Sequence, residues 1–288
     1  MANGNLKLAV QKKGRLTEKT MRLLRNCGLD IDDYSERLLI SARNFNLDLL
    51  FVRDDDIPEY VQDGVADIGI VGENVLLEKK ATVKIRKKLG FGKCKLMIGI
   101  PENVELEEAR DLEGKRIATS YPNILKQFLW DNGISARIIQ ISGSVEIAPS
   151  LGMADYICDI VSTGNTLKLN KLKKFIPIFE SQAVLIGHKN IRDERKIKLL
   201  ADLNSRIDSA LIAKKSNYIM MNIPKEQLNE VTEILPALSS PTVLPLADNT
   251  MVAVHAVIPT DTFWEIKREL QFAGATGILL LPINNMII

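Results

Sequence analysis

Apolar residues follow two different periods through the first two thirds of the chain. Short apolar runs such as Leu6 to Val10 and Leu47 to Val52 predict strands, and the spacing in Thr17 to Cys27 predicts an amphipathic helix. Strands that alternate with helices form a parallel sheet, so the pattern indicates an α/β fold. Further strands are expected at Ala66 to Val71, Cys94 to Ile100, Arg116 to Thr119, Ala136 to Ile141 and Ala183 to Gly187, with helices over Ile57 to Asp63 and Ile124 to Asn132.

The chain is expected to build two lobes. Gly90, Gly92 and Pro101 bracket a crossover into a second α/β unit, and the strand Ala183 to Gly187 resembles a return to the first unit. Two crossings would leave a cleft between the lobes, and ligands in open α/β sheets collect at the carboxyl ends of strands. The loops that follow strands are therefore the candidates for chemistry.

The last third of the chain has a different order. A charged amphipathic helix over Asp193 to Ala213 precedes a β-α-β-β-α-β succession, which predicts a ferredoxin-like module. This module carries no catalytic constellation, which favours a regulatory or assembly role. Its expected strands are Tyr218 to Ile223, Thr242 to Leu246, Val252 to Ile258 and Gly277 to Pro282, and its helices are Lys225 to Leu235 and Thr262 to Phe272.

Composition narrows the class of protein. The 288 residues are 46% hydrophobic and 26% charged, as in ordinary globular proteins. A net charge of +2 without a basic run interleaved with aromatic residues argues against nucleic acid and fits a small anionic substrate better. Three cysteines without a Cys-x-x-Cys pair indicate a reducing compartment. Without a signal sequence or an apolar run of about 18 residues, a cytoplasmic location and no membrane contact are expected.

The segment from Asp155 to Leu167 carries the clearest chemical signal. A strand-like run ends in a turn at Gly164, and the hydroxyls of Ser162, Thr163 and Thr166 can join backbone amides around a phosphate. Thr166 is also expected to cap a helix over residues 167–175. The segment indicates a sugar-phosphate cradle, and the alternative is an ordinary strand, turn and helix cap.

Two aspartates lie on one face of the cradle strand. Asp155 and Asp159 are four residues apart, which separates them by roughly 13 Å along a strand. They cannot both bind one sugar diol. We therefore assign the sugar hydroxyls to Asp159 and leave Asp155 as a strand-edge or capping residue.

Other loops at strand ends carry weaker signals. Gln11 to Arg15 places three cations around a glycine, which suits a polyphosphate or is simply solvated. One of Asp54 to Asp56 is expected to be a helix N-cap. Glu73 and Glu146 each either face a ligand or begin a helix. Ser120 caps a helix or helps to bind an anion, with Tyr121 offering an aromatic face. His188 and His255 are expected to be structural.

These motifs together resemble the ATP phosphoribosyltransferases, in the long form that has a C-terminal regulatory domain. The resemblance runs the length of the chain. It rests on six ordered motifs, which are Lys13 to Leu16, Asp54 to Pro58, Gly69 to Asn74, Ile117 to Pro122, Gly143 to Pro149 and Asp155 to Leu167.

The resemblance implies the first reaction of histidine biosynthesis. N1 of the ATP adenine attacks the anomeric carbon of 5-phosphoribosyl 1-pyrophosphate, and pyrophosphate and N1-(5-phosphoribosyl)-ATP are formed. Because N1 bears no proton to remove, the protein supplies positioning and charge stabilisation and needs no covalent nucleophile. Mg²⁺ would arrive on the substrate phosphates without a dedicated protein site.

The resemblance also implies roles for individual residues. Phosphoribosyl pyrophosphate is assigned to Asp159, Ser162, Thr163, Gly164, Asn165, Thr166 and Leu167. ATP is assigned to Gln11, Lys12, Lys13, Gly14, Arg15, Glu73, Ser120 and Tyr121. Charge stabilisation is assigned to Lys13, Arg15 and Glu146.

Histidine is implied as a feedback inhibitor that binds the ferredoxin-like module, in an assembly that ranges from dimer to hexamer. An acidic residue is sometimes found at the position of Asn222, and an amide pairs less well with an ammonium group. The residues assigned to histidine are Asn222, Leu238, Ser240, Thr242 and Gly277.

The expected architecture is a periplasmic-binding-protein-like core of two α/β lobes plus the ferredoxin-like domain. Lobe I would comprise residues 1–93 and 181–210, lobe II residues 94–180, and the regulatory domain residues 211–288. One rival function is another phosphoribosyl-transferring enzyme, although the adjacent acidic pair of base-salvage enzymes is missing beside Asp159. The other rival is a non-enzymatic protein that binds a small ligand between two lobes.

Overall fold

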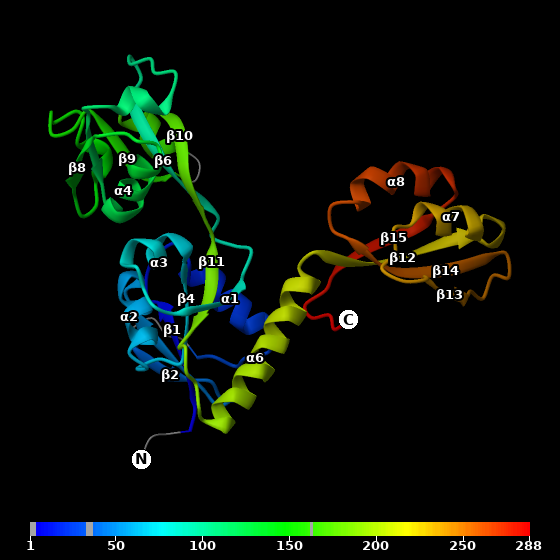
Figure 1. Ribbon diagram of the computed structural model, residues 1–288. Coiled ribbons are helices and arrows are strands. Elements are labelled where there is room, and N and C mark those ends of the chain that lie inside the picture. The colour runs from blue at the N-terminus through cyan, green and yellow to red at the C-terminus, as the bar shows by residue number, and fades with distance from the viewer. Residues whose placement is uncertain (1–3, 33–36, 162–163) are drawn as a thin grey trace. The chain divides into compact units, whose positions relative to one another are not determined.

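The computed structural model describes residues 4–32, 37–161 and 164–288 (Figure 1). Two compact units make up the chain. The first comprises residues 1–21 and 30–197, and the second comprises residues 22–29 and 198–288. The first unit contains two sheets and the second contains one, as the succession of apolar runs predicts.

Lobe I is built on a six-stranded sheet. Its order is β2-β3-β1-β4-β11-β5, with β1 parallel to both β3 and β4. β11 lies between β4 and β5 and runs antiparallel to both, which confirms that the late apolar strand returns to the first lobe. The strands are β1 (Leu6–Gln11), β2 (Leu39–Ser41), β3 (Leu47–Val52), β4 (Ile68–Gly72), β5 (Lys84–Lys88) and β11 (Ala183–Gly187), and the helices are α1 (Thr17–Asn26), α2 (Ile57–Gln62) and α3 (Glu73–Lys79).

Lobe II is built on a five-stranded sheet of order β10-β6-β9-β7-β8. β7 is parallel to β8 and β9, while β6 is antiparallel to β9 and β10. The strands are β6 (Cys94–Pro101), β7 (Arg116–Thr119), β8 (Arg137–Gln140), β9 (Tyr156–Val161) and β10 (Leu172–Ser181), and the helices are α4 (Pro122–Asp131) and α5 (Asn165–Leu169).

The helix predicted over residues 167–175 is wrong. α5 ends at Leu169, Lys171 adopts a left-handed conformation with φ 55°, and the chain then forms β10. β10 is an edge strand, and its register with β6 shifts on both sides of Pro177. Edge strands and such irregularities are the places where a sheet tolerates proline. Phe175, Phe179 and their β-branched neighbours pack on the lobe II core, so tertiary packing overrides the helical spacing.

Two crossings join the lobes, and they are hydrogen-bonded to each other. The Leu89 amide donates to the Ala183 carbonyl at 2.9 Å, and the Ala183 amide donates to the Phe91 carbonyl at 2.9 Å. Beside them, the buried hydroxyl of Ser181 donates to Asn74 Oδ1 at 2.7 Å and accepts from the Asn74 amide at 3.1 Å. The start of α3 is thereby attached to the crossing that leads from β10 to β11.

The second unit contains an antiparallel sheet of order β13-β14-β12-β15. Together with its helices this sheet has the ferredoxin-like order that the sequence predicts. Ile219, Val254 and Leu270 form part of its buried core. The unit comprises α6 (Glu194–Ala213, which begins in the first unit), β12 (Ser216–Pro224), α7 (Leu228–Ile234), β13 (Thr242–Pro245), β14 (Met251–Pro259), α8 (Phe263–Phe272) and β15 (Thr276–Pro282).

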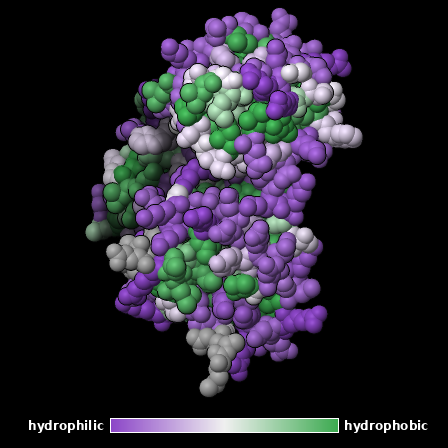
Figure 2. All heavy atoms as spheres, turned by 90° about the vertical axis from the view of Figure 1, so that its left-hand side faces the viewer, coloured by the Kyte–Doolittle hydropathy of each residue, from purple (hydrophilic) through white to green (hydrophobic). Residues whose placement is uncertain are grey.

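The surface is mixed in character. Hydrophilic side chains cover most of the face in Figure 2, and hydrophobic side chains gather there in separate patches. Among the described residues, no helix has the length and apolar character needed to cross a membrane.

Candidate active site

The loop after β1 folds around Gln11. The Gln11 side-chain oxygen accepts a hydrogen bond from the Leu16 amide at 3.0 Å. The Gln11 backbone carbonyl accepts one from the Thr17 hydroxyl at 3.1 Å. Lys13, Gly14 and Arg15 form the exposed part of this loop, and the Lys12 amide is attached to the Val52 carbonyl of β3 at 2.8 Å. Gln11 therefore shapes the loop and leaves the cations accessible.

Asp54 and Asp55 belong to the site and not to a helix cap. They follow β3 as a 3-10 turn (Asp54–Asp56). Asp56 occupies the N-cap position of α2, as predicted for one of the three aspartates, although its side chain makes no capping hydrogen bond. Burial raises the pKa of Asp54, the neighbouring charge of Asp55 raises it further, and a hydrogen bond from Gln11 partly opposes both. The side chains face the cleft because the preceding strand ends there.

Ser120 connects two loops of lobe II. Its hydroxyl donates to the Ile141 carbonyl at 2.7 Å and accepts the Gly143 amide at 3.2 Å. The capping role considered for Ser120 is wrong, because Tyr121 occupies the N-cap position of α4 and its side chain makes no capping hydrogen bond. Ser120 instead holds the loop between β8 and Glu146 against the end of β7.

The pKa of Tyr121 is affected by charged groups from several elements around the cleft. Burial raises the pKa of its hydroxyl, and the charges of Asp159, Asp54 and Asp55 raise it further, while Arg15 lowers it. Arg15 lies in the loop after β1, Asp54 and Asp55 follow β3, and Asp159 lies within β9. The structure thus brings Arg15 and Asp159 within electrostatic reach of Tyr121.

A cavity of about 780 Å³ opens at this place. Its lining comes from both lobes and includes Asp54, Asp55, Ser120, Tyr121 and Gly143. Its volume lies within the usual range for small-molecule sites.

Glu78 connects the two lobes at the edge of this cavity. Its carboxylate, on α3 of lobe I, accepts the backbone amide of Asn123 at 3.0 Å and that of Ile124 at 3.1 Å. The backbone carbonyl of Glu78 accepts a hydrogen bond from the Asn123 side-chain amide at 2.9 Å. A carboxylate at the N-terminus of a helix satisfies amides that have no partner within the helix and interacts favourably with the helix dipole. The cap that α4 lacks within lobe II is therefore supplied by lobe I.

Asp159 and Asp155 have different environments, as their spacing along the strand predicts. Burial raises the pKa of Asp159, an amide hydrogen bond from Ile160 at 2.7 Å opposes this, and the charge of Glu146 adds to it. Asp155 forms an ion pair with Arg116 at 2.8 Å and also accepts the Arg116 amide at 2.8 Å. Its pKa is lowered, first by the Arg116 side chain. Asp155 thus secures the edge of the sheet, and Asp159 faces Glu146.

The cradle continues from β9 into α5. Gly164 occupies the N-cap of α5 with φ 91°, a conformation that glycine adopts without strain. Asn165, Thr166 and Leu167 form the first turn, so Thr166 lies inside the helix and its predicted capping role is wrong. Ser162 and Thr163, assigned to the sugar phosphate, lie outside the described residues.

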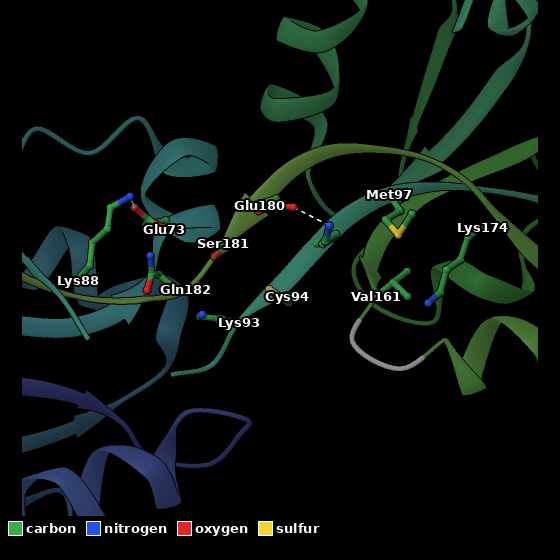
Figure 3. Close-up of a pocket in the computed structure, with 11 residues that line it drawn as sticks. Glu73, Lys88, Lys93, Cys94, Met97, Val161, Lys174, Glu180, Ser181 and Gln182 are labelled. Carbon is green, nitrogen blue, oxygen red and sulfur yellow. Dashed lines mark ion pairs between the residues drawn. The ribbon is translucent and has the colours of Figure 1, made fainter. Parts of the chain in front are cut away.

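A second cavity, of about 480 Å³, lies on the side of β10 and the crossings (Figure 3). Glu73 and Lys88 from lobe I form an ion pair at 3.2 Å, and Lys95 and Glu180 from lobe II form another at 2.6 Å. Glu73 lines this cavity, whereas Ser120 and Tyr121 line the larger one. The residues assigned to ATP are therefore divided between two parts of the cleft.

The residues assigned to the effector lie in two parts of the third sheet, whose edge strands are β13 and β15. Asn222 of β12 pairs in register with Thr276 of β15, and an ideal Cβ at Gly277 would lie 3.6 Å from the Asn222 side-chain nitrogen. Leu238 and Ser240 are exposed in the segment before β13, and Thr242 begins that strand opposite His255 of β14. Asn222 and Gly277 are thus close together, while the other three residues lie on and before the edge strand of the same sheet.

Neither the cysteines nor the histidines form a nucleophilic site among the described residues. The three cysteines are free and buried, and burial raises the pKa of Cys27 to about 12 and also raises that of Cys158. His188 accepts the Asn190 amide, and His255 contacts the Tyr218 hydroxyl. The described part of the chain holds no cluster of three or more His, Cys, Asp or Glu side chains suited to a metal ion.

Comparison with known proteins decides the family. The family model described as ATP phosphoribosyltransferase matches residues 53–209, and that of its C-terminal domain matches residues 213–285. The chain belongs to the ATP phosphoribosyltransferase family. Phosphoribosyl transfer to ATP, at the first step of histidine biosynthesis, is its activity, and the third sheet belongs to its C-terminal regulatory domain.

Relatives in this family match along almost their whole length. The ATP phosphoribosyltransferase of Cytophaga hutchinsonii is 48% identical, with 98% of each chain covered, and that of Phocaeicola vulgatus is also 48% identical, with 98% of this chain and 100% of the relative covered. A solved ATP phosphoribosyl transferase (HisG:HisZ) complex from Thermotoga maritima aligns with a TM-score of 0.59 at 33% identity. That alignment covers 98% of the solved chain and 70% of this one.

Proposed function

We propose that the cleft holds phosphoribosyl pyrophosphate at the end of β9 and ATP across the cleft, so that N1 of the adenine attacks the anomeric carbon. The new carbon–nitrogen bond forms as the bond from that carbon to pyrophosphate breaks, and the leaving pyrophosphate takes the electron pair. Tyr121 lines the larger cavity together with Asp54 and Asp55, and this meeting of residues from both lobes carries the proposal. No proton leaves N1, so the residues need only to orient the substrates and stabilise charge.

Individual roles follow from position and charge. Asp159 accepts the ribose hydroxyls, and residues 162–167 bind the 5-phosphate through amides and hydroxyls. Lys12, Lys13 and Arg15 bind phosphates of ATP or the departing pyrophosphate, and Gln11 and Gly14 hold their loop in shape. Tyr121 packs on the adenine beside Ser120. Glu146 stabilises the positive charge that develops on the ribose.

Glu73 is assigned to ATP binding on the basis of the sequence alone. Glu73 also forms an ion pair with Lys88, and both residues line the smaller cavity. A second role of Glu73 is therefore to orient the Lys88 ammonium toward that cavity. Mg²⁺ would neutralise substrate phosphates. The adjacent Asp54 and Asp55 carboxylates fit this cation, because oxygen donors are the ligands that it prefers and a cation relieves their mutual repulsion.

We also propose the domain limits that the sequence predicts, with lobe I comprising residues 1–93 and 181–210, lobe II residues 94–180 and the regulatory domain residues 211–288. Free histidine binds the regulatory domain near Asn222 and Gly277, and the chain assembles from dimers into hexamers. The three free, buried cysteines are compatible with a cytoplasmic location. Light scattering with and without histidine tests the assembly, and a monomer under both conditions would contradict it.

A direct assay tests the activity. Purified protein mixed with ATP, phosphoribosyl pyrophosphate and Mg²⁺ should form N1-substituted adenine, which is followed by its altered ultraviolet absorbance. Replacing ATP with free purine bases is the control for a base-salvage enzyme. Binding of both substrates without turnover would favour a binding protein instead.

A further inference from the structure

Two helices belong in part to each of the two compact units. α1 contributes residues 17–21 to the first unit and residues 22–26 to the second, while α6 contributes residues 194–197 to the first unit and residues 198–213 to the second. Neither helix contains glycine or proline, the residues that most often kink a helix. A displacement at one end of either helix is therefore carried to its other end.

The start of α1 is attached to the loop of residues 11–15, which carries the cations assigned to ATP. The Thr17 hydroxyl donates to the Gln11 carbonyl, and the Leu16 amide donates to the Gln11 side-chain oxygen. The Thr20 amide donates to the Leu16 carbonyl at 2.9 Å, so helical hydrogen bonding extends back to the loop. A shift of α1 along its axis would move the loop with it.

The end of α1 is attached to α6. Gly28 ends the helix in a left-handed conformation with φ 74°, and the two hydrogen bonds that close this end use the carbonyls of Leu24 and Arg25. The Cys27 carbonyl accepts instead from the Arg206 guanidinium at 3.2 Å. A cation at the carboxyl end of a helix also interacts favourably with the helix dipole.

Arg206 has a fixed place on α6. Leu203 and Ile207 beside it are at most 1% exposed, so this part of the helix is packed in the interior of the second unit. At its start, α6 is anchored to lobe I by an ion pair of 2.9 Å between Lys196 and Asp67. Arg206 lies about 15 Å further along the helix, so a tilt about the anchored start would displace it.

α6 also receives the segment that follows β15. The Met286 amide donates to the Ser209 carbonyl at 3.2 Å, and the Ser209 hydroxyl lies 3.4 Å from Asn285 Oδ1. Ser209 is three residues after Arg206 and therefore on the same side of the helix. β15 itself contains Gly277, one of the residues assigned to histidine. Contacts thus continue from the assigned effector residues through α6 to the end of α1.

We propose that α6 and α1 transmit histidine binding from the regulatory domain to the loop of residues 11–15, and that Arg206 joins the two helices. The proposal rests on the proposed effector site and adds the route by which that site acts on catalysis. Histidine shifts β15 and the segment after it, α6 and α1 follow, and the cations of the loop leave the positions in which they bind phosphates. Inhibition then needs no overlap between histidine and a substrate.

Steady-state kinetics and calorimetry together test the role of Arg206. Arg206→Met should raise the histidine concentration for half inhibition at least about tenfold, while kcat without histidine and the Kd for histidine each change by less than about twofold, because only the coupling is lost. Arg206→Lys can still donate to the Cys27 carbonyl and should restore most of the inhibition. Lys198→Met is the matched control, since it removes an exposed cation of the same helix, and should leave inhibition unchanged.

Hydrogen exchange in the wild type tests the route without any substitution. Histidine should change the exchange of peptides that cover residues 11–29 and leave those that cover α2 unchanged, and Arg206→Met should lose this response. Inhibition of the wild type with unaltered exchange over residues 11–29 would overturn the route, as would undiminished inhibition of a folded Arg206→Met protein. Wild-type protein that binds no histidine in calorimetry would refute the proposed effector site and the route with it.

Discussion

Asp159 carries a charge at a position that disfavours it. Burial raises its pKa, the nearby Glu146 adds to this effect, and the hydrogen bond from the Ile160 amide only partly opposes it. A carboxylate that is unfavourable for folding yet well placed at the end of β9 is typical of a functional group. Its cost to stability and its use in substrate binding can be separated by one substitution.

We expect Asp159→Asn to lower kcat/KM at least about tenfold, which corresponds to roughly 1.4 kcal/mol of transition-state stabilisation, because the charged acceptor for the ribose hydroxyls is lost. The same variant should melt at a higher temperature than the wild type at neutral pH. Scanning calorimetry together with the ultraviolet assay measures both effects. Near-normal turnover would contradict the role in ribose binding.

The sign of the pH effect follows from proton linkage. The folded protein retains the Asp159 proton to a higher pH than the unfolded chain does, so stability falls as pH rises between the two pKa values and the penalty persists above them. The advantage of Asp159→Asn should therefore shrink as the pH approaches about 4, near the pKa of an unperturbed aspartate. Asp155→Asn is the control of opposite sign, because Arg116 lowers the pKa of Asp155, and its effect should be a destabilisation at neutral pH.

At the scale of residues, the local sequence pattern predicted where a residue lies better than it predicted which residues its side chain contacts. Spacing along the strand separated Asp155 from Asp159, and Asp155 indeed lies just before β9 whereas Asp159 lies within it. The partner of Asp155, Arg116, is 39 residues away in the sequence and joins it only because β7 and β9 are neighbours. One of Asp54 to Asp56 was expected to be an N-cap because a helix follows, and Asp56 holds that position, whereas Asp54 and Asp55 line the cleft after β3.

At the scale of elements, α4 depends on a different lobe for its N-terminus. The Glu78 carboxylate accepts two of its first amides, and Tyr121 directly precedes the helix. The interaction therefore couples the orientation of α3 to that of the tyrosine.

Glu78→Ala should destabilise the protein by about 1 kcal/mol, the usual effect of losing an N-terminal cap, and lower the melting temperature by roughly 2–4 °C. The KM for ATP should rise, since Tyr121 is less firmly positioned. Calorimetry and kinetics measure the two effects. Glu78→Gln keeps the acceptor oxygen without the charge and should fall between Ala and wild type. Equal stability of all three proteins would show that the interaction contributes nothing to folding.

The strands that the sequence foresaw best are those bounded by clear turn residues. Arg116 to Thr119 was predicted with its observed limits, and the return of Ala183 to Gly187 to lobe I was also foreseen. β10 was not predicted because its apolar residues also fit helical spacing. Its pairing partner, β6, is far away in the sequence, so local pattern does not indicate an edge strand.

At the scale of the whole molecule, the regulatory domain offers the sharpest test of inhibition. Asn222→Asp should lower the histidine concentration needed for half inhibition by about five- to tenfold, because a carboxylate forms a charge-assisted bond to the amino group of the inhibitor. Inhibition curves at fixed substrate concentrations measure this. Asn217→Asp on the same strand is the matched control. Unchanged inhibition in the Asn222 variant would place histidine elsewhere.

The division of the cleft into two cavities could not be foreseen. Strand-end loops were expected to meet, and charged residues that follow β1 and β3, together with Asp159 of β9, act on Tyr121. Glu73 also follows a strand, but its ion pair with Lys88 depends on β5, a short charged strand that carries little apolar signal. Sequence patterning identifies which loops approach a site, whereas the pairing of charged side chains across it depends on the assembled sheets.

The insertion of β11 between β4 and β5 has a consequence for biosynthesis on the ribosome. β5 pairs with β11 alone, and β4 has β11 on its second side, so the sheet of lobe I stays incomplete until Gly187 has been translated. All of lobe II is made during that interval and can fold first as an independent unit. Until then the nascent chain exposes an unpaired edge at β4, and a chaperone that covers this edge would favour correct closure.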